Sequence, residues 1–410
     1  MKSDTEVAII GGGAAGIAAG RRLHDVGIDC LIVEARDRLG GRAFTVAGPG
    51  GHALDLGCGW LHSADQNEWT AIARAQGRTI DDTPPPWARS SVGFRPGEQQ
   101  DYHRAFDAFE RRIGALAVAE QDVAVAAALE PGARWNGLIG AVVTFISGGE
   151  AAEVSALDYE NYAHTDVNWR VVEGYGATIA AHGEGVPAAF GAAVRRIDHS
   201  GRRLKIETAA GTIAADRAIV TLPTTVLAAM ETLFAPALPG KIAAAHDLPL
   251  GLDDKLFIAL DRAEEFEKDS RLFGAKDDSK TAAYHIRPFG RPMIEAFFGG
   301  ANARALEAEG EGAFFDFAVT ELTEFFGNDL AGRLKPITMH RWAADPFARG
   351  AYSYAVPGRA GRRAELAAPV DDRLFFAGEA CSRHDYSTAH GAYRTGLAAA
   401  EQVMAARKSK

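Results

Sequence analysis

Three glycines and one glutamate near the start of the chain have the spacing of a dinucleotide-binding site. Gly11, Gly13 and Gly16 follow one apolar run, and Glu34 closes the next. In such a unit the first glycine allows a tight turn, the second lets the backbone approach a pyrophosphate, and the third lets helix and strand pack closely. An acid roughly twenty residues further on accepts hydrogen bonds from the ribose hydroxyls. FAD and NAD both fit this chemistry, whereas a carboxylate here would repel the extra phosphate of NADP.

A strand–helix–strand unit must hold these residues in place. The apolar residues 7–10 and 30–33 predict two buried parallel strands, and the small residues 14–25 predict the helix between them. The helix would begin at Ala14 and Ala15, where its unpaired N–H groups and partial positive charge attract phosphates. A lone glycine motif is weak evidence, but the complete unit predicts a Rossmann-type nucleotide-binding domain.

A second glycine loop comes directly after Glu34. Ala35 and Arg36 lead into a glycine pair that ends at Gly41, and Arg42 follows it. The N–H groups and the guanidinium of such a loop could bind further phosphate. An NAD dehydrogenase has no particular need of a second phosphate loop here, whereas an FAD that lies along the protein does.

A block of small residues at 54–63 continues the pattern. Gly57 and Gly59 would let the backbone pass close to a planar ring, and Trp60 and His62 would project beyond it. Together with the phosphate loop, this block favours FAD over NAD.

In this order, residues 11–16 with Glu34, then 38–42, then 55–62 resemble the flavin-dependent amine oxidase family. That family includes monoamine, polyamine and L-amino acid oxidases, and later blocks at 374–379 and 386–393 follow its order too. The resemblance implies an α/β fold in which a Rossmann-type FAD-binding domain is interleaved with an α+β substrate domain. The expected ranges are 1–83, 188–246 and 344–410 for the FAD-binding domain, and 84–187 and 247–343 for the substrate-binding domain.

The resemblance extends the cofactor site along the chain. It places Val194 at the adenine, Glu379 at the ribityl hydroxyls, and the helix that starts near Ala389 at the pyrimidine edge of the flavin. The dipole of that helix would stabilise the negative charge of reduced flavin. Ala351 stands where covalently flavinylated members have cysteine, so the FAD is expected to be noncovalent. The expected cofactor contacts are Gly11, Gly13, Ala14, Ala15, Gly16, Glu34, Ala35, Arg36, Gly41, Arg42, Gly57, Gly59, Trp60, Val194, Trp342, Gly378, Glu379, Thr388 and Ala389.

Five residues are expected to be catalytic on the same grounds. Lys255 begins an apolar strand and matches the family lysine that holds a water against flavin N5; a buried lysine needs a partner or a functional reason. Its expected role is in flavin reoxidation and imine hydrolysis rather than in C–H cleavage. Trp342 and Tyr352 match aromatics beside the ring, and Thr388 replaces the second tyrosine of monoamine oxidases, as in polyamine-type members. His62 resembles a histidine that polyamine oxidases place near the substrate.

The resemblance implies that an amine transfers a hydride equivalent to the flavin. The resulting imine is hydrolysed to an aldehyde or ketone, and dioxygen is reduced to hydrogen peroxide. An L-amino acid oxidase is an alternative, with Arg89, Arg170 and Arg287 as candidates for a carboxylate clamp. A flavoprotein scaffold without turnover is a second alternative. The amine itself stays open, and for the assembly the family gives a homodimer as the expectation.

Composition sets further bounds. The 410 residues carry a net charge of −10, with 47% hydrophobic and 24% charged residues. This predicts a globular protein and argues against nucleic-acid binding, which relies on basic patches. No stretch approaches the roughly 20 apolar residues of a membrane span, and the start lacks a signal-peptide pattern. Three widely spaced cysteines favour a reducing compartment, so we expect a cytoplasmic protein, and the histidines lack metal-ligand spacing, so no metal is expected.

The middle of the chain carries weaker signals. A triple proline at 84–86 reads as a boundary. Helix-period apolar residues then predict helices over 102–113, 115–129 and 136–146.

Overall fold

The predicted strand–helix–strand unit opens the fold. The structure, a computed structural model, describes residues 2–408. β1 (Asp4–Ile10), α1 (Ala14–Asp25) and β2 (Cys30–Val33) follow one another along the chain, with the strands parallel and Ile10 opposite Val33. The two strands therefore end at the same edge of the sheet, where the glycine turn and Glu34 begin.

Strands from distant parts of the chain complete this sheet of eight strands. Its order is β11-β8-β9-β10-β1-β2-β7, with β17 paired to β10. The strands β10 and β17 run parallel to β1 and β2, so their carboxyl ends lie at the same edge. The added strands are β7 (Ala188–Ala189), β8 (Val194–Asp198), β9 (Leu204–Thr208), β10 (Gly211–Val220), β11 (Phe234–Ala235) and β17 (Leu374–Phe376).

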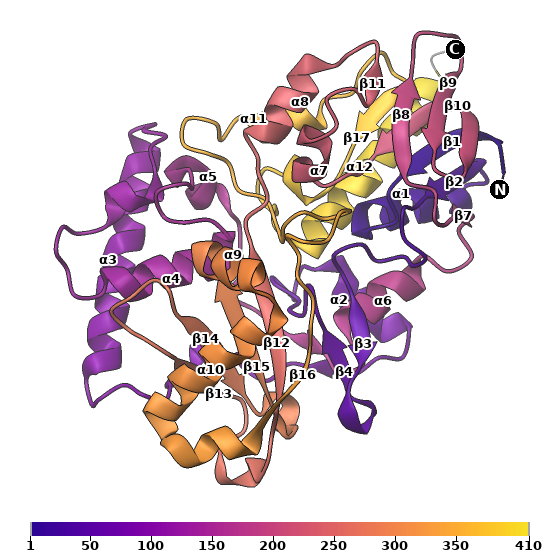
Figure 1. The fold of residues 1–410 in the computed structure, drawn as a ribbon. Helices are drawn as coiled ribbons and strands as arrows, with labels where there is room; N and C mark the ends of the chain where they lie inside the picture. Colours follow the sequence, from indigo (N-terminus) through magenta and orange to yellow (C-terminus); the bar gives the residue numbers. More distant parts are fainter. Residues whose placement is uncertain (1, 409–410) are drawn as a thin grey trace.

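The last helix packs on the first. Figure 1 shows α12 (Ala389–Lys408) beside α1, although the two helices lie at opposite ends of the chain. A Cβ on Gly396 would lie 2.2 Å from the carbonyl oxygen of Ala15, so only glycine allows this approach. The two ends of the predicted cofactor site are thereby brought to one side of the sheet.

A second sheet of five antiparallel strands has the order β13-β14-β15-β12-β16. Its apolar core includes Phe314, Ala318 and Leu322 from α10 (Glu311–Phe326), the helix that follows α9 (Gly300–Glu309). The strands are β12 (Asp253–Leu260), β13 (Ser270–Phe273), β14 (Ala282–Ile286), β15 (Met293–Gly299) and β16 (Leu334–Met339). The mixed α/β class with a Rossmann-type sheet is confirmed, while the exact domain limits stay a prediction.

One predicted helix is wrong. The prediction of a helix over 115–129 fails because α3 ends at Val118 and Glu120 takes a φ of +53°. Beyond the turn, the N–H groups of Val125 and Ala126 bond to carbonyls at 154 and 151, so only a short 3-10 helix forms at 125–128. The helices of this region are α3 (Glu98–Val118), α4 (Asn136–Ser147) and α5 (Ala156–Asn161).

The remaining α-helices and strands lie outside the two large sheets and the helices already named. They are α2 (Glu68–Ala75), α6 (Tyr175–His182), α7 (Thr224–Ala228), α8 (Pro239–His246), α11 (Arg362–Ala367), β3 (Thr45–Ala47), β4 (Ala53–Asp55), β5 (Ile80–Asp81) and β6 (Arg170–Val171). Over residues 2–408, no helix is long and apolar enough to cross a membrane.

A buried ion pair ties α5 to α11. Arg363 donates to both carboxylate oxygens of Asp158 at 2.7 and 2.8 Å, and both side chains are about 1% exposed. The guanidinium also donates to the Ser353 hydroxyl at 2.9 Å and lies over the Tyr386 ring, 3.8 Å from its centroid. Burial disfavours the charged arginine, but Asp158 outweighs this and raises the pKa of Arg363. This pair fastens the helical region to the segment that leads into β17.

Candidate active site

The glycine turn lies at the edge of the sheet where β1, β2, β10 and β17 end, all of them parallel. Gly11 has a φ of +105° and its N–H donates to the carbonyl of Val33 at 2.9 Å. The Thr221 hydroxyl, just past the end of β10, donates to the carbonyl of Ile10 at 2.8 Å. Ligands of α/β sheets bind in the crevice outside such strand ends. The turn therefore lies at the place where a nucleotide binds in this fold class.

Two glycines of the turn have different surroundings. A Cβ on Gly16 would lie 2.0 Å from the carbonyl oxygen of Gly11, so this position serves close packing of helix on turn. A Cβ on Gly13 would meet nothing nearer than Gly41 Cα, at 4.0 Å. The backbone of Gly13 is thus open on one side, and α1 begins directly after it with Ala14 and its neighbour Ala15. This open backbone at a helix N-terminus fits a pyrophosphate.

Glu34 is buried and already holds the surrounding backbone. Its Oε2 accepts the N–H of Gly12 at 2.6 Å, and its Oε1 accepts the N–H of Arg36, across Ala35, at 2.8 Å. Each carboxylate oxygen keeps acceptor capacity for a ribose hydroxyl. The carbonyl of Glu34 accepts from the N–H of Ala192, two residues before the predicted adenine contact Val194.

The Arg36 side chain binds most closely to Asp345, outside the glycine turn. It donates to both oxygens of Asp345 at 2.8 Å, and His340 contacts the same carboxylate at 2.9 Å. Burial would raise the pKa of Asp345, but His340 and Arg36 outweigh it and hold that pKa well below its usual range. The Arg36 guanidinium thus anchors a distant loop, while its other terminal nitrogen lies 3.9 Å from Glu34 Oε1, to which the Arg36 backbone N–H also donates.

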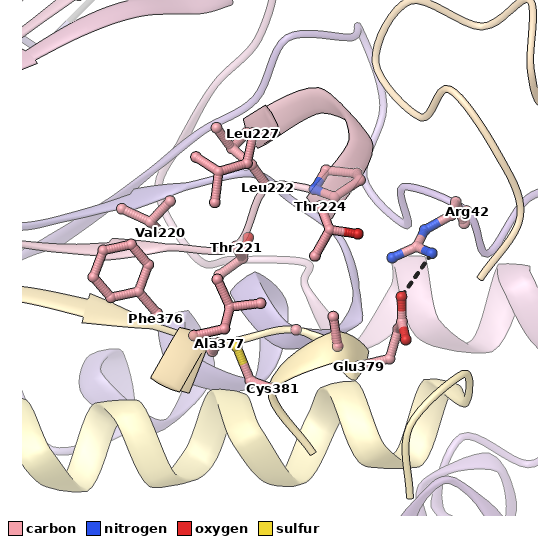
Figure 2. A pocket seen from close by; sticks show the side chains of 14 residues that line it. Arg42, Val220, Thr221, Leu222, Thr224, Leu227, Phe376, Ala377, Glu379 and Cys381 are labelled. Atoms are coloured by element: carbon pink, nitrogen blue, oxygen red, sulfur yellow. Dashed lines mark hydrogen bonds and ion pairs between the residues drawn. The ribbon is translucent and has the colours of Figure 1, made fainter. Parts of the chain in front are cut away.

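A pocket at the ends of β10 and β17 contains the predicted ribityl site. Figure 2 shows Arg42 and Glu379 pointing toward one another at its edge, with Thr221 and Cys381 lining it. Arg42 donates to Glu379 Oε1 at 3.0 Å and to the carbonyl of Ala351 at 2.6 Å.

Glu379 is buried beside Gly378 and connects three segments. Its Oε2 accepts from the Ser353 hydroxyl at 2.6 Å and from the N–H of Ser387 at 2.9 Å. Burial would raise the pKa of Glu379, but Arg42 and the hydroxyl of Ser353 hold it below its ordinary value. A carboxylate kept ionised in this way is a strong acceptor for hydroxyl groups.

The block 56–60 lies between two predicted flavin neighbours. The indole N–H of Trp342 donates to the carbonyl of Leu56 at 3.1 Å, and a Cβ on Gly57 would lie 3.1 Å from the Trp342 ring. A Cβ on Gly59 would lie 3.3 Å from Lys255 Nζ. The structure thus brings the predicted tryptophan and lysine to opposite ends of this short segment.

Lys255 is 5% exposed and faces a fully buried acid. Its ammonium lies 3.4 Å from Glu295 Oε1, and Arg170 donates to Glu295 Oε2 at 2.9 Å. Burial would raise the pKa of Glu295, but Arg170 and Lys255 outweigh it and lower that pKa to about 2. The ammonium therefore has an ionised partner across the whole neutral pH range.

Tyr352 reaches toward the helical region. Its hydroxyl donates to the carbonyl of Phe145 in α4 at 2.6 Å. Asp253 lies two residues before Lys255, on the same face of β12, and its Oδ1 has no hydrogen-bond partner among residues 2–408. Burial raises the pKa of Asp253 to about 8, although Lys255 and Tyr352 favour its charged form.

The last two predicted catalytic residues already have structural partners. The Thr388 hydroxyl accepts the N–H of Gly391 at 2.9 Å, which caps α12 just before Ala389. His62, close to Trp60 in sequence, lies 2.7 Å from the side-chain oxygen of Asn168, and burial lowers its pKa to about 4. Both lie where the resemblance places them in sequence, and their catalytic roles stay predictions.

Comparison with known proteins decides the family. The family model described as flavin containing amine oxidoreductase matches residues 140–404. The chain belongs to this family. A second model, an NAD(P)-binding Rossmann-like domain, matches residues 9–75 of this flavin-containing amine oxidoreductase.

Similar proteins agree with that assignment. Polyamine oxidase 2 of Arabidopsis thaliana is 28% identical over 96% of this chain and 87% of its own length. Lysine-specific histone demethylase 1 homolog 2 of Oryza sativa subsp. japonica is 27% identical over 98% of this chain and 57% of its own. The structure of putrescine oxidase bound to putrescine has a TM-score of 0.78 at 18% identity, covering 99% of this chain and all of that one. The predicted family, fold and enzyme class are confirmed, and the family implies FAD.

Sequence reasoning missed the polar partners around the site. Glu295 is an acid inside the apolar run of β15, a pattern that could have drawn attention because buried acids need partners. Asp253 had a similar signal, since it precedes Lys255 at the start of a buried strand. Ser353 and Ser387 carry no signal in sequence, because only the fold brings them to Glu379.

Proposed function

We propose that this flavoprotein oxidises an amine to an imine and passes the electrons to dioxygen. The imine is hydrolysed to an aldehyde or ketone plus ammonia or an amine, and hydrogen peroxide is released. One observation carries the proposal: Trp342 contacts one end of the 56–60 segment and Lys255 lies beside the other. The names of the similar polyamine and putrescine oxidases favour an amine of that class.

The chain's own residues provide binding, orientation and charge. FAD, when bound, would supply the two-electron redox chemistry. Gly13 and the N-terminus of α1 would hold its pyrophosphate, Glu34 its ribose and Glu379 its ribityl chain. Trp342 would fix the segment against which the ring lies. Since Ala351 has no thiol to offer, we propose a noncovalent FAD that acid precipitation releases into the supernatant.

Lys255 would hold a water beside the reacting centre. Its ammonium is held by Glu295, and its remaining N–H groups can donate hydrogen bonds to water or to reduced oxygen species. We expect Lys255→Met to slow flavin reoxidation by dioxygen by at least about tenfold. This is the size of effect that removal of one charged side chain from an active site commonly has. The FAD affinity of Lys255→Met should stay within about twofold of the wild-type affinity, since Lys255 is not among the predicted phosphate and ribose contacts.

Stopped-flow absorbance of the flavin measures both half-reactions. Lys335→Met is the matched control, because Lys335 is an exposed lysine in the neighbouring strand β16. Reoxidation rates equal to wild type in Lys255→Met would contradict the role given to this lysine.

An anaerobic panel of amines and amino acids tests the substrate class. Bleaching of the oxidised flavin by diamines or polyamines, and not by amino acids, supports the proposal. Two arginines considered for an amino-acid clamp are already engaged: Arg170 with Glu295, and Arg287 with the carbonyls of Phe266 and Gly290. Bleaching by amino acids alone would decide for an amino acid oxidase, and bleaching by neither class would favour a scaffold.

A further inference from the structure

The charged residues around Lys255 form a buried group that the proposed reaction does not by itself require. We propose that Glu295, held by Arg170, is a positioning residue that fixes the Lys255 ammonium beside the 56–60 segment. This inference rests on the proposed function of Lys255 and adds the device that sets its position and charge.

The sheet register places the acid next to the lysine. In the antiparallel pair β12–β15, Lys255 lies opposite Phe297, and Glu295 is two residues along the same face. Diagonal neighbours of this kind lie within reach of long side chains. The Lys255 ammonium lies 3.4 Å from Glu295 Oε1. It also lies 5.7 Å from the centroid of the Phe297 ring.

Arg170 reaches the same carboxylate from a separate part of the chain. Its two terminal nitrogens donate to Glu295 at 2.9 and 3.4 Å, in a forked arrangement that fixes the plane of the carboxylate. The guanidinium also lies over two aromatic rings, 4.9 Å from the centroid of Trp60 and 4.7 Å from that of Phe289. Glu295 therefore cannot turn away from Lys255 without giving up its arginine.

The group carries two cations for one fully buried anion. Glu295 is 0% exposed, and the side chains of Arg170 and Lys255 are 7% and 5% exposed. His285 Nδ1 lies 3.8 Å from Glu295 Oε2, and its Nε2 lies 3.3 Å from Asp269. Burial lowers the pKa of His285 although Asp269 favours the charged ring, so the neutral imidazole adds no further cation.

The buried ion pairs of Glu295 with Lys255 and Arg170 are not expected to add much to the stability of the fold. The desolvation of buried charges commonly offsets their attraction, so apolar residues could fill this space at similar free energy. A surplus positive charge next to the predicted flavin ring has a functional use, because negative charge develops on the ring and on dioxygen during turnover.

The substitution Glu295→Gln keeps the size of the side chain and removes its charge. Lys255 would then face Arg170 without a counter-ion, so the ammonium moves or releases its proton more easily. We expect reoxidation to slow by about tenfold, while reduction by the amine changes by less than about threefold. The alkaline limb of the reoxidation pH profile should move to lower pH. The other titratable groups facing Lys255 are Asp253 on its own strand and Cys58 beside Gly59.

Glu321→Gln is the matched control. Glu321 is a partly buried acid of α10 that accepts from the hydroxyls of Tyr284 and Thr281, on the same sheet but away from Lys255. Removing the charge of Glu321 should change the free energy of unfolding but leave the pH profile of reoxidation unchanged. Urea unfolding of the FAD-free proteins reports the stability change of each variant separately from turnover.

A double substitution separates positioning from direct action. If Glu295 acts through Lys255, then Glu295→Gln adds less than about a twofold effect in the Lys255→Met background. Independent, multiplying effects of the two substitutions would overturn the inference. So would wild-type reoxidation and an unmoved pH profile in Glu295→Gln when Lys255→Met alone is slow. A Lys255→Met variant that reoxidises normally would instead overturn the role of the lysine itself.

Discussion

Alanine at Gly16 should lower the stability of the fold, whereas alanine at Gly13 should weaken FAD binding. In Gly16→Ala, the new Cβ would lie 2.0 Å from the carbonyl oxygen of Gly11, far inside the 3.4 Å of ordinary contact. The atom it meets is backbone, so helix and turn must separate. Overpacking of this kind costs about 1–3 kcal/mol, of which roughly 1 kcal/mol is offset by the better helix propensity of alanine.

Gly13→Ala should leave the fold intact and damage the cofactor site alone. Its φ of −79° is open to alanine, and the Cβ would meet no protein atom closer than 4.0 Å. We expect the free energy of unfolding of the FAD-free protein to change by less than about 1 kcal/mol. A methyl group in the space of the pyrophosphate should cost about 1–3 kcal/mol in binding, which weakens FAD affinity by about 5- to 150-fold.

Urea unfolding of the FAD-free proteins and titration with FAD, followed by flavin fluorescence, measure the two quantities. Gly240→Ala is the control, because this glycine lies in α8 with no atom within 4 Å of an added Cβ. FAD affinity within about twofold of wild type in Gly13→Ala would refute the placement of the pyrophosphate against this residue.

Two further outcomes follow from the buried charges. Arg363→Met should lower the free energy of unfolding by about 3–5 kcal/mol in urea titrations, because it leaves the Asp158 carboxylate buried without its partner; a loss below about 1 kcal/mol would contradict this. Asp253 binds a proton in the folded protein up to a pKa of about 8, whereas the unfolded chain releases it near pH 4. Its contribution to stability therefore falls as pH rises between these values, and Asp253→Asn should make stability less dependent on pH in that window. Parallel pH curves for the variant and wild type would count against a neutral Asp253.

The local parts of the fold were open to prediction because each depends on a short stretch of chain. The helix from Ala14 and the strand ending at Val33 need only the glycine turn and two apolar runs. The missed features depend on contacts between distant residues. The segment after Val118 was predicted as helix from its apolar periodicity, yet the N–H groups of Val125 and Ala126 bond to carbonyls at 154 and 151. Helix propensity is a weak preference that tertiary contacts override.

The predicted site shows the same division. Gly13 and Glu34 were predicted from spacing, and Glu379 from the family resemblance, and all three stay predictions. The partners that set their charge and position could not be predicted, because Arg42 and Ser353 reach Glu379 only through the folded chain. Glu295 is separated from Arg170 by 125 positions in sequence.

The packing of α12 against α1 has a consequence for the order of events during synthesis. The glycine turn leaves the ribosome long before Glu379 and α12 do. A growing chain therefore presents a nucleotide-binding turn long before the pocket around the flavin can close. Tight retention of FAD should begin only after Glu379 and α12 have been synthesised, and chains truncated before residue 378 should lose it on gel filtration. Retained cofactor would in this way report that α12 has packed against α1.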